Sequence, residues 1–359
     1  MAKTHPSVKS ESLSKEQVIS NATEWYGRER PLYRKLCEKI LSILNEILDQ
    51  EKINFHTATC RAKDVNSYSE KIKDSKYDDP INQIHDLAGI RIIAYVDDDV
   101  VRVCRIIKRV FEIDPLNSID KSDELGIDKV GYRSVHFVAQ LKADRLKLPE
   151  YKKFSGKKFE IQVRTILQHA WAEIEHDRNY KFAGELPPEI ERKFKLLAGN
   201  LELADQEFNS LAKDIDKISR SVDKATKEGR LDIPINSTTL RQYLSTKFAS
   251  SLGEFIDPTF HGKDNMIVNE LKDFGVTTLE ELQKLIPRDF EEKVINVPSE
   301  KLLSFLGILR IIMMVSDYKK YFEESWKKHW NSISQRLRSI LTEYNLPIEK
   351  IEKTYNLVS

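Results

Sequence analysis

One short segment, FEIQVRT, carries the residues whose types and spacing point most directly to chemistry. Successive side chains of a β-strand point to opposite faces, so the apolar residues of this segment would face a core. Glu160, Gln162 and Arg164 would then share the other face. An acid, an amide and a guanidinium on one strand face form either a solvated sheet surface or the polar wall of a cleft.

Two further predicted strands bring polar groups to one side. In YRSVHFVAQL, Tyr132, Ser134 and His136 share one face of the strand, whereas Val135 and Phe137 share the other face. In HDLAGIRIIAY, Asp86 precedes a strand that is too apolar to be solvated, and Arg91 lies inside it. Polar groups on one side of three neighbouring strands favour a ligand cleft over a solvated surface.

Carboxylates and cations in one cleft suggest Mg²⁺ held against phosphates. Asp86 and Glu160 come from different predicted strands. Magnesium prefers one or two carboxylates together with phosphate oxygens of a substrate. Phosphoryl-type transfer requires little from the protein beyond positioning and charge neutralisation. The cations available for this purpose are Arg61, Lys63, Lys71, Arg91 and Arg164.

The elements that must position these residues form an α/β unit, assigned to residues 21–186 after a flexible N-terminal tail at 1–20. The change between helical and strand periodicity marks each element. An acidic, irregular loop is expected at 114–130. The predicted strands are 53–62, 88–96, 132–141 and 159–165, and the predicted helices are 21–52, 65–73, 98–111 and 166–179.

The rest of the chain is predicted to be helical. Pro187 and Pro188 mark a boundary, and 187–230 reads as a long amphipathic segment with apolar residues at spacings of three and four. Residues 231–359 are assigned to an all-helical C-terminal domain of unknown role, for which regulation is one candidate, with a buried helix at 302–315. Its segment 271–287 resembles a helix-hairpin-helix. A last helix is expected to carry one apolar stripe from Trp326 to Tyr344.

Composition excludes several classes of protein. The 359 residues include 58 Lys+Arg and 57 Asp+Glu, so the net charge is 58 − 57 = +1, which argues against an all-over nucleic-acid-binding surface. The three cysteines form no CxxC pair, which excludes a disulfide scaffold and fits a reducing cytosol. We expect a cytoplasmic protein, since no targeting or membrane segment is visible. The sequence also lacks a GxxxxGK[ST] phosphate-binding loop.

The order of motifs along the chain resembles the synthetase domain of the RelA/SpoT family, closest to its small alarmone synthetases. The motifs are HDLAGIRIIAY, GYRSVHFV and FEIQVRTILQHAWAEIEHDRNYK, and the resemblance covers about residues 25–225. It implies a nucleotidyltransferase-like fold, a mixed sheet flanked by helices. It also implies an enzyme, a pyrophosphokinase that moves the β,γ-pyrophosphate of ATP onto the ribose 3′-hydroxyl of GDP or GTP and makes the alarmone (p)ppGpp with Mg²⁺.

The resemblance also implies residue roles. Asp86 and Glu160 match the catalytic, Mg²⁺-binding acids, and Glu160 is the candidate to activate the attacking hydroxyl. The residues that match ATP-binding positions are Arg61, Lys63, Ser67, Lys71 and Arg91. Those that match the acceptor side are Lys129, Tyr132, Ser134, His136, Gln162, Arg164, Glu173 and Asn179, with Tyr132 stacking on the acceptor base.

One departure leaves the acceptor open. Guanosine-specific members carry a lysine four residues before the stacking tyrosine, where this chain has Asp128, and Lys129 is displaced by one position. An alternative is therefore a toxin-type member that pyrophosphorylates the 3′ end of tRNA and blocks translation. A non-catalytic nucleotide-binding module is disfavoured because both acids and the donor-side cations are present.

Partners and further activities complete the expectations. The HD pairs His85-Asp86 and His176-Asp177 lack the large upstream helical domain of a family hydrolase, so synthesis without degradation is expected. The family uses the region after the synthetase for self-association, and the stripe at 189–228 fits a homo-oligomer. A regulatory partner is expected at the C-terminal domain, and no membrane partner.

Overall fold

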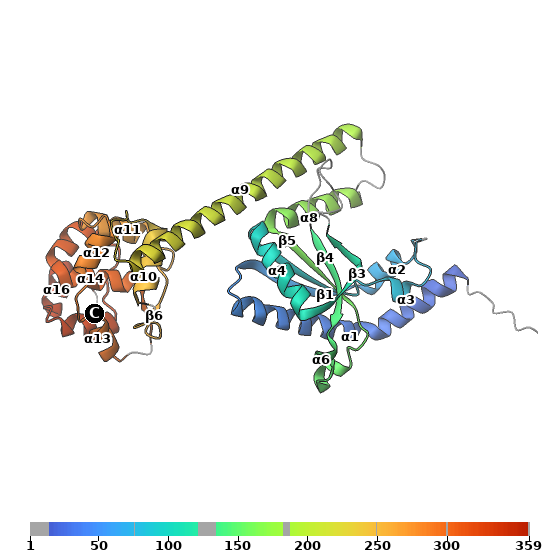
Figure 1. Ribbon diagram of the computed structural model, residues 1–359, viewed down its shortest axis with the longest axis horizontal. Coiled ribbons are helices and arrows are strands. Elements are labelled where there is room, and N and C mark those ends of the chain that lie inside the picture. Colours follow the sequence, from blue (N-terminus) through green and yellow to red (C-terminus); the bar gives the residue numbers. More distant parts are fainter. Residues whose placement is uncertain are drawn as a thin grey trace, which may run out of the picture. The chain divides into compact units, whose positions relative to one another are not determined.

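The computed structural model describes residues 14–74, 76–120, 134–181, 187–248, 250–298 and 301–357, with the backbone alone for 120 and 176–181. The chain divides into two compact units, Met1–Leu211 and Ala212–Ser359. The boundary falls inside helix α9 (Pro188–Lys227), which is one uninterrupted helix (Figure 1). Each unit is described by itself below.

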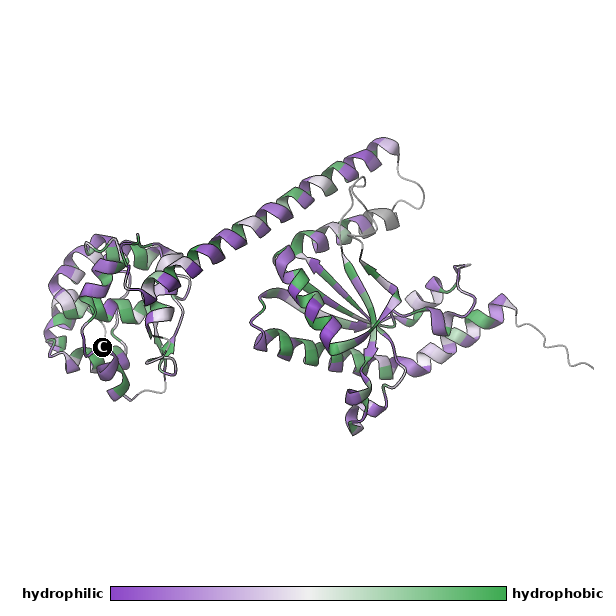
Figure 2. Cartoon of the chain, in the orientation of Figure 1, coloured by the Kyte–Doolittle hydropathy of each residue, from purple (hydrophilic) through white to green (hydrophobic). Residues whose placement is uncertain are grey.

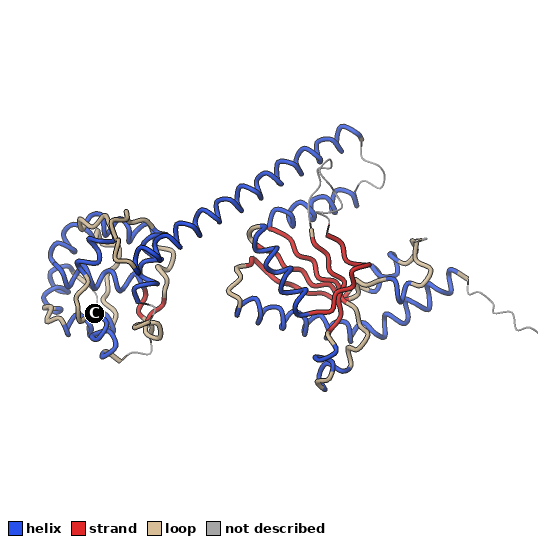
Figure 3. Tube along the Cα trace, in the orientation of Figure 1, coloured by secondary structure: helices blue, strands red, loops and turns tan. Residues whose placement is uncertain are grey.

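The first unit is built on a five-stranded mixed sheet (Figure 3). The spatial order is β1-β2-β5-β4-β3, in which β2 and β5 run parallel and all other neighbours run antiparallel. The strands are β1 (Phe55–Ala62), β2 (Ala88–Ala94), β3 (Phe111–Asp120), β4 (Val135–Leu141) and β5 (Phe159–Thr165). The predicted fold class, a mixed sheet flanked by helices, is confirmed.

Two helices, α1 (Lys15–Gln50) and α4 (Asp97–Val110), share one hydrophobic core with the apolar face of the sheet. On β5 this face consists of Phe159, Ile161 and Val163, which are all fully buried. The alternate side chains of the same strands point to the other face, as the period of two predicts. The remaining helices of this unit are α2 (Val65–Lys71), α3 (Pro80–Gln83), α6 (Ala143–Leu146), α7 (Pro149–Lys152) and α8 (Ile166–Lys181).

Two expectations about this unit are wrong. Helix α1 begins at Lys15 rather than residue 21, because Ser14 and Gln17 form a reciprocal cap at its start. The segment expected as a loop from residue 114 continues strand β3 to Asp120. Asp114 makes this possible, since its carboxylate accepts hydrogen bonds from Leu116, Asn117 and Lys158 across an irregularity in the strand pairing.

The second unit is a helical domain with its own hydrophobic core, as predicted, but it is not entirely helical. Two short strands pair in parallel, β6 (Ile256–Asp257) and β7 (Leu303–Ser304). The expected hairpin is present: Gly275 takes a φ of +85° and Thr278 caps the next helix with Glu281. Its helices are α10 (Ser237–Phe248), α11 (Asp264–Asp273), α12 (Leu279–Leu285), α13 (Phe290–Asn296), α14 (Phe305–Lys320), π-helix η1 (Tyr321–Ser325), α15 (Gln335–Glu343) and α16 (Ile348–Tyr355).

The expected last helix with one continuous stripe is wrong. Trp326 and Trp330 lie in a turn segment after η1, where Lys327 and Lys328 both take positive φ, and α15 starts only at Gln335. The two tryptophans instead pack against each other and against Phe322.

Hydropathy alternates along α9, as Figure 2 shows. Several of its large apolar side chains are more than half exposed: Leu196, Leu197, Leu203, Phe208, Leu211 and Ile215. None of the helices that the structure describes is long and apolar enough to cross a membrane.

Candidate active site

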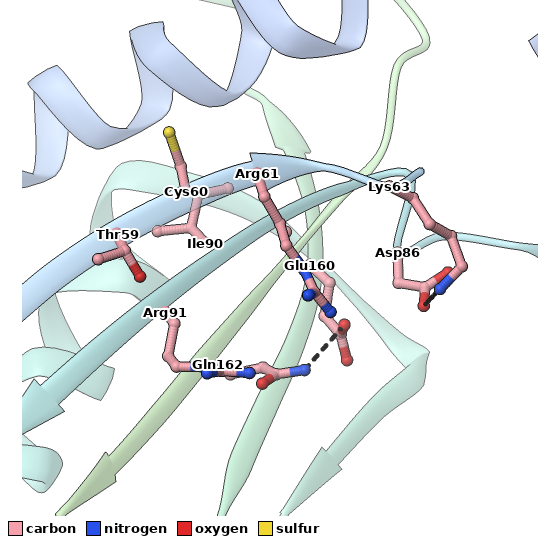
Figure 4. A pocket seen from close by; sticks show the side chains of 10 residues that line it. Thr59, Cys60, Arg61, Lys63, Asp86, Ile90, Arg91, Glu160 and Gln162 are labelled. Atoms are coloured by element: carbon pink, nitrogen blue, oxygen red, sulfur yellow. Dashed lines mark hydrogen bonds and ion pairs between the residues drawn. The ribbon is translucent and has the colours of Figure 1, made fainter. Parts of the chain in front are cut away.

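A pocket of about 190 Å³ opens on the polar face of the sheet (Figure 4). Strands β1, β2 and β5 form its floor, and the segment before β2 closes one end with Asp86. The lining residues are Thr59, Cys60, Arg61, Lys63, Asp86, Gly89, Ile90, Arg91, Glu160 and Gln162.

Strand register explains why these residues meet. Arg91 on β2 is in register with Gln162 on β5, which in turn pairs with His136 on β4. In the next row, Gly89 lies between Arg61 on β1 and Glu160 on β5. A cation, an amide and an imidazole therefore form one row, and a cation and a carboxylate flank a glycine in the other.

Asp86 is held by two lysines. Its Oδ2 accepts hydrogen bonds from Lys63 Nζ at 2.8 Å and Lys71 Nζ at 2.9 Å. Burial alone would raise the pKa of Asp86, but Lys71 and Lys63 outweigh it and keep that pKa below its ordinary value. Asp86 is therefore an ionised carboxylate at neutral pH. Its other oxygen, Oδ1, is buried and has no hydrogen-bond partner among the described residues.

Glu160 belongs to a chain of hydrogen bonds that crosses β4 and β5. Its Oε1 lies 2.8 Å from His136 Nδ1, and His136 Nε2 lies 2.9 Å from Ser134 Oγ. Burial tends to raise the pKa of Glu160, but the bond and charge of His136 lower it below the usual range. An ionised carboxylate can only accept, so His136 Nδ1 carries the proton of this bond.

The other polar side chains of β5 extend this series of hydrogen bonds. Gln162 Nε2 donates to Glu160 Oε2 at 3.2 Å, and Arg164 Nη2 donates to Gln162 Oε1 at 2.9 Å. Burial and the nearby charge of Arg91 lower the pKa of Arg164, although an arginine stays protonated in either case. Arg164 Nε is buried without a hydrogen-bond partner among the described residues.

Helix α8 contributes Glu173, which pairs with Arg91 at 2.9 Å. His169, one turn earlier, lies 3.7 Å from the same carboxylate. Burial and Arg91 lower the pKa of His169, so the imidazole is neutral at pH 7. Glu173 therefore orients Arg91 at the edge of the pocket.

The backbone of Lys63 is fixed by groups that sequence reasoning missed. Its carbonyl accepts from Tyr26 Oη at 2.7 Å and from Arg30 Nε at 2.9 Å, both on α1. Its N–H donates to the carbonyl of Leu87 at 2.9 Å. The helix on the apolar side of the sheet thus sets the position of a cation in the pocket.

Most predicted site residues that the structure describes are brought together. Lys71, Ser134, His136, Arg164 and Glu173 do not line the pocket themselves but are joined to its lining residues by hydrogen bonds, directly or, for Ser134, through His136. Ser67 is exposed on α2 and does not line the pocket. Lys129 and Tyr132 lie outside the described residues, and so does the side chain of Asn179. Sequence reasoning missed Thr59, Cys60, Gly89 and Ile90; the strand period around Arg61 and Arg91 was the available signal for Thr59 and Gly89.

The side chains in this pocket that could bind a metal fit one hard divalent cation, such as Mg²⁺, better than zinc. The described residues hold no group of three or more His, Cys, Asp or Glu side chains suited to a metal. Asp86 and Glu160 both line the pocket, and the buried Oδ1 of Asp86 has no hydrogen-bond partner among the described residues, so this oxygen could serve as a metal ligand. Two carboxylates with the remaining ligands left to water or phosphate is the arrangement that Mg²⁺ prefers.

Part of the chain that contains this pocket is similar to known proteins. Residues 60–185 match the family described as "Region found in RelA / SpoT proteins". The chain is similar to GTP pyrophosphokinase YwaC of Bacillus subtilis strain 168, at 30% identity over 134 residues, 37% of this chain and 60% of that protein. It is also similar to GTP pyrophosphokinase YjbM of the same strain, at 28% identity over 187 residues, 50% of this chain and 81% of that protein.

Among solved structures, small alarmone synthetase 1 from Bacillus subtilis is 25% identical, with a TM-score of 0.45 over 54% of this chain and 98% of that chain. The match with YwaC spans less than two thirds of that relative's length. The matched family region contains every residue that lines the pocket except Thr59. Residues 60–185 are therefore the part of this chain that is similar to the RelA/SpoT region, and the two relatives similar to this chain are named GTP pyrophosphokinase.

Proposed function

We propose that this protein transfers the β,γ-pyrophosphate of ATP to the ribose 3′-hydroxyl of GDP or GTP. The observation that carries the proposal is one pocket in which two ionised carboxylates, Asp86 and Glu160, meet several cations. This pocket lies in a RelA/SpoT region, and both curated relatives are named GTP pyrophosphokinase.

The donor half is assigned as follows. Asp86 and Glu160 would hold Mg²⁺, which would neutralise charge on the ATP phosphates. Lys63 and Lys71 both donate to one oxygen of Asp86. When ATP binds, their ammonium groups would donate to phosphate oxygens instead. Arg61 and Arg91 flank Gly89 and would enclose the adenine, since guanidinium groups stack on aromatic faces.

The acceptor half lies on the β4 side of Glu160. Glu160 would accept the proton of the 3′-hydroxyl as that oxygen attacks the β-phosphorus of ATP, and AMP would leave. His136 and Gln162 hold the two carboxylate oxygens, which keeps Glu160 in one orientation for this task. Arg164 would face the acceptor nucleotide. Lys129, Tyr132 and Asn179 keep their acceptor roles as part of the proposal, whereas Glu173 is assigned to orienting Arg91 on the donor side.

The test is incubation of the full chain with γ-³²P-labelled ATP, Mg²⁺ and one acceptor at a time: GDP, GTP, ATP or tRNA. Label on GDP or GTP supports the proposal, and label on tRNA alone would establish the toxin-type alternative. No labelled product with any acceptor, together with retained ATP binding, would leave the non-catalytic nucleotide-binding module. Incubating the labelled product alone tests the expected lack of hydrolysis.

We also propose a homo-oligomer through α9. The supporting observation is the row of exposed apolar side chains along this helix, since isolated apolar patches of this length are rare on monomers. The ten apolar positions from Ile190 to Val222 alternate in steps of four and three, the spacing of a helix-pairing seam. Light scattering of the parent chain and of a Leu211→Glu, Ile215→Glu variant tests this, and equal masses would contradict it.

A further inference from the structure

The junction between β5 and α8 is organised by one residue, Thr165, which is completely buried. Thr165 Oγ1 accepts from the backbone N–H of Gln168 at 3.1 Å, and Gln168 Oε1 accepts from the N–H of Thr165 at 3.0 Å. This reciprocal cap satisfies two N–H groups at the start of α8. It also sets the direction in which α8 leaves the strand.

Both sides of this junction carry site residues. Arg164, directly before Thr165, donates to Gln162, and Glu173 on α8 pairs with Arg91. Rotation or translation of α8 about the junction would therefore move Glu173 away from Arg91. The same movement would shift the end of β5 that carries Arg164.

A third element reaches this junction from a distance of 40 residues along the chain. Asp205 on α9 accepts a hydrogen bond from Thr165 Oγ1 at 2.6 Å. Thr165 has one hydroxyl proton, and giving it to Asp205 aims a lone pair at the N–H of Gln168. Asp205 is 4% exposed, and burying a carboxylate is costly unless it is held by hydrogen bonds. Its place at the first turn of α8 also favours a negative charge.

We propose that Asp205 is a positioning residue, which orients the β5–α8 junction so that Arg91 and Arg164 are aligned for the two nucleotides. This inference rests on the proposed function. Asp205 does not line the pocket, and its hydrogen bond to Thr165 connects it to the β5–α8 junction.

The location of the contact determines which kinetic constant changes. Asp86 and Glu160 lie at the opposite end of β2 and β5 from Thr165, and they are held by Lys63, Lys71 and His136. Asp86 has no contact with the junction, and Glu160 is linked to it only indirectly, by the hydrogen bonds from Arg164 to Gln162 and from Gln162 to Glu160 among the described residues. Loss of Asp205 therefore impairs nucleotide binding by the arginines and leaves the chemical step intact, which raises KM and spares kcat.

The experiment compares Asp205→Ala, Asp205→Asn and Asn209→Ala in the full chain. Asparagine keeps an acceptor oxygen for Thr165, whereas alanine removes it. Asn209 is the matched control, because it joins the same helix to Asp98 on α4 by two hydrogen bonds of 3.0 Å and lies one turn from Asp205. Measurements are kcat and KM for ATP and GDP, calorimetric binding of the α,β-methylene ATP analogue, and thermal unfolding.

We expect Asp205→Ala to raise KM and the Kd of the analogue about tenfold with kcat within about twofold, since small displacements of positioning groups have large effects. Asp205→Asn should recover most of this loss, and Asn209→Ala should match the parent in KM and Kd. If Asp205→Ala is unstable, Thr165→Ser against Thr165→Val repeats the comparison with and without the hydroxyl.

Three results would overturn the inference: unchanged Kd in folded Asp205→Ala, an equal loss in Asn209→Ala, or a fall in kcat at unchanged KM. The proposed function fails separately. If the parent chain binds the analogue but transfers no label, the function is wrong, and the Kd comparison still decides the role of Asp205.

Discussion

Replacement of Asp86 by asparagine separates the proposed catalytic role of this carboxylate from its role in the fold. The amide would keep the shape of the side chain but lose its charge, so Lys63 and Lys71 would both lose their counter-ion. The unpartnered Oδ1 would also no longer be available as an anionic ligand for the proposed Mg²⁺. A bound metal ion stabilises transition-state charge by several kcal/mol. If the variant loses about 4 kcal/mol of this stabilisation, its kcat/KM should fall about 10³-fold.

The stability effect is smaller. Hydrogen bonds to charged groups contribute about 1.5–3 kcal/mol when buried, and the lower end applies here because Asp86 is 23% exposed and the lysines can turn to water. We expect a loss of about 2 kcal/mol, or about 4–8 °C in Tm for a unit of this size. The lowered pKa adds a pH signature: the stabilisation by Asp86 is present above about pH 4 and is lost as the pH falls through its depressed folded value.

The assay is transfer of γ-³²P label to the preferred acceptor, measured beside thermal melts between pH 3 and pH 8. A double variant, Asp86→Asn with Lys71→Met, removes one of the two uncompensated ammonium groups. It should recover stability but not activity. Asp144→Asn is the matched control, since Asp144 pairs with Lys147 on an exposed helix outside the pocket. Activity above a tenth of the parent value in Asp86→Asn, or activity that returns with stability in the double variant, would refute the reasoning.

Three further outcomes are expected. Gly89→Val should raise the KM for ATP about tenfold, because the new side chain projects into the pocket. The Tm should stay unchanged, because a Cβ at this position meets no atom closer than 3.8 Å. Steady-state kinetics and thermal melts measure the two values. Glu270→Ala should destabilise the second unit by about 3–5 kcal/mol, because it leaves buried Arg310 without its carboxylate; a urea melt followed by tryptophan fluorescence measures this, and a change below about 1 kcal/mol contradicts it. Lys158 lowers the pKa of Asp114 to about 2, so Asp114→Asn should lower Tm at pH 7 but converge with the parent as the pH falls from about 4 toward 2, and a constant difference over that range would count against the ion pair.

The fold was predictable wherever a local pattern was sufficient. The alternation in FEIQVRT placed Glu160, Gln162 and Arg164 on one face, and the structure joins them in one hydrogen-bonded chain. The loop expected from residue 114 failed for a nonlocal reason: Lys158 and strand β4 stabilise that segment as β3, and neither is near it in sequence. The last helix failed because buried contacts among aromatic rings, rather than helical periodicity, place Trp326 and Trp330.

The sequence by itself determined which side chains share a strand face, because that depends only on the period of two in an extended chain. It also determined the chemistry available there, carboxylates with cations. Only the tertiary structure decided which row each residue joins, since register is set by pairing between strands. It alone brought Lys71 to Asp86 and Asp205 to Thr165, because contacts between distant segments depend on how whole elements pack and leave no local periodicity to read.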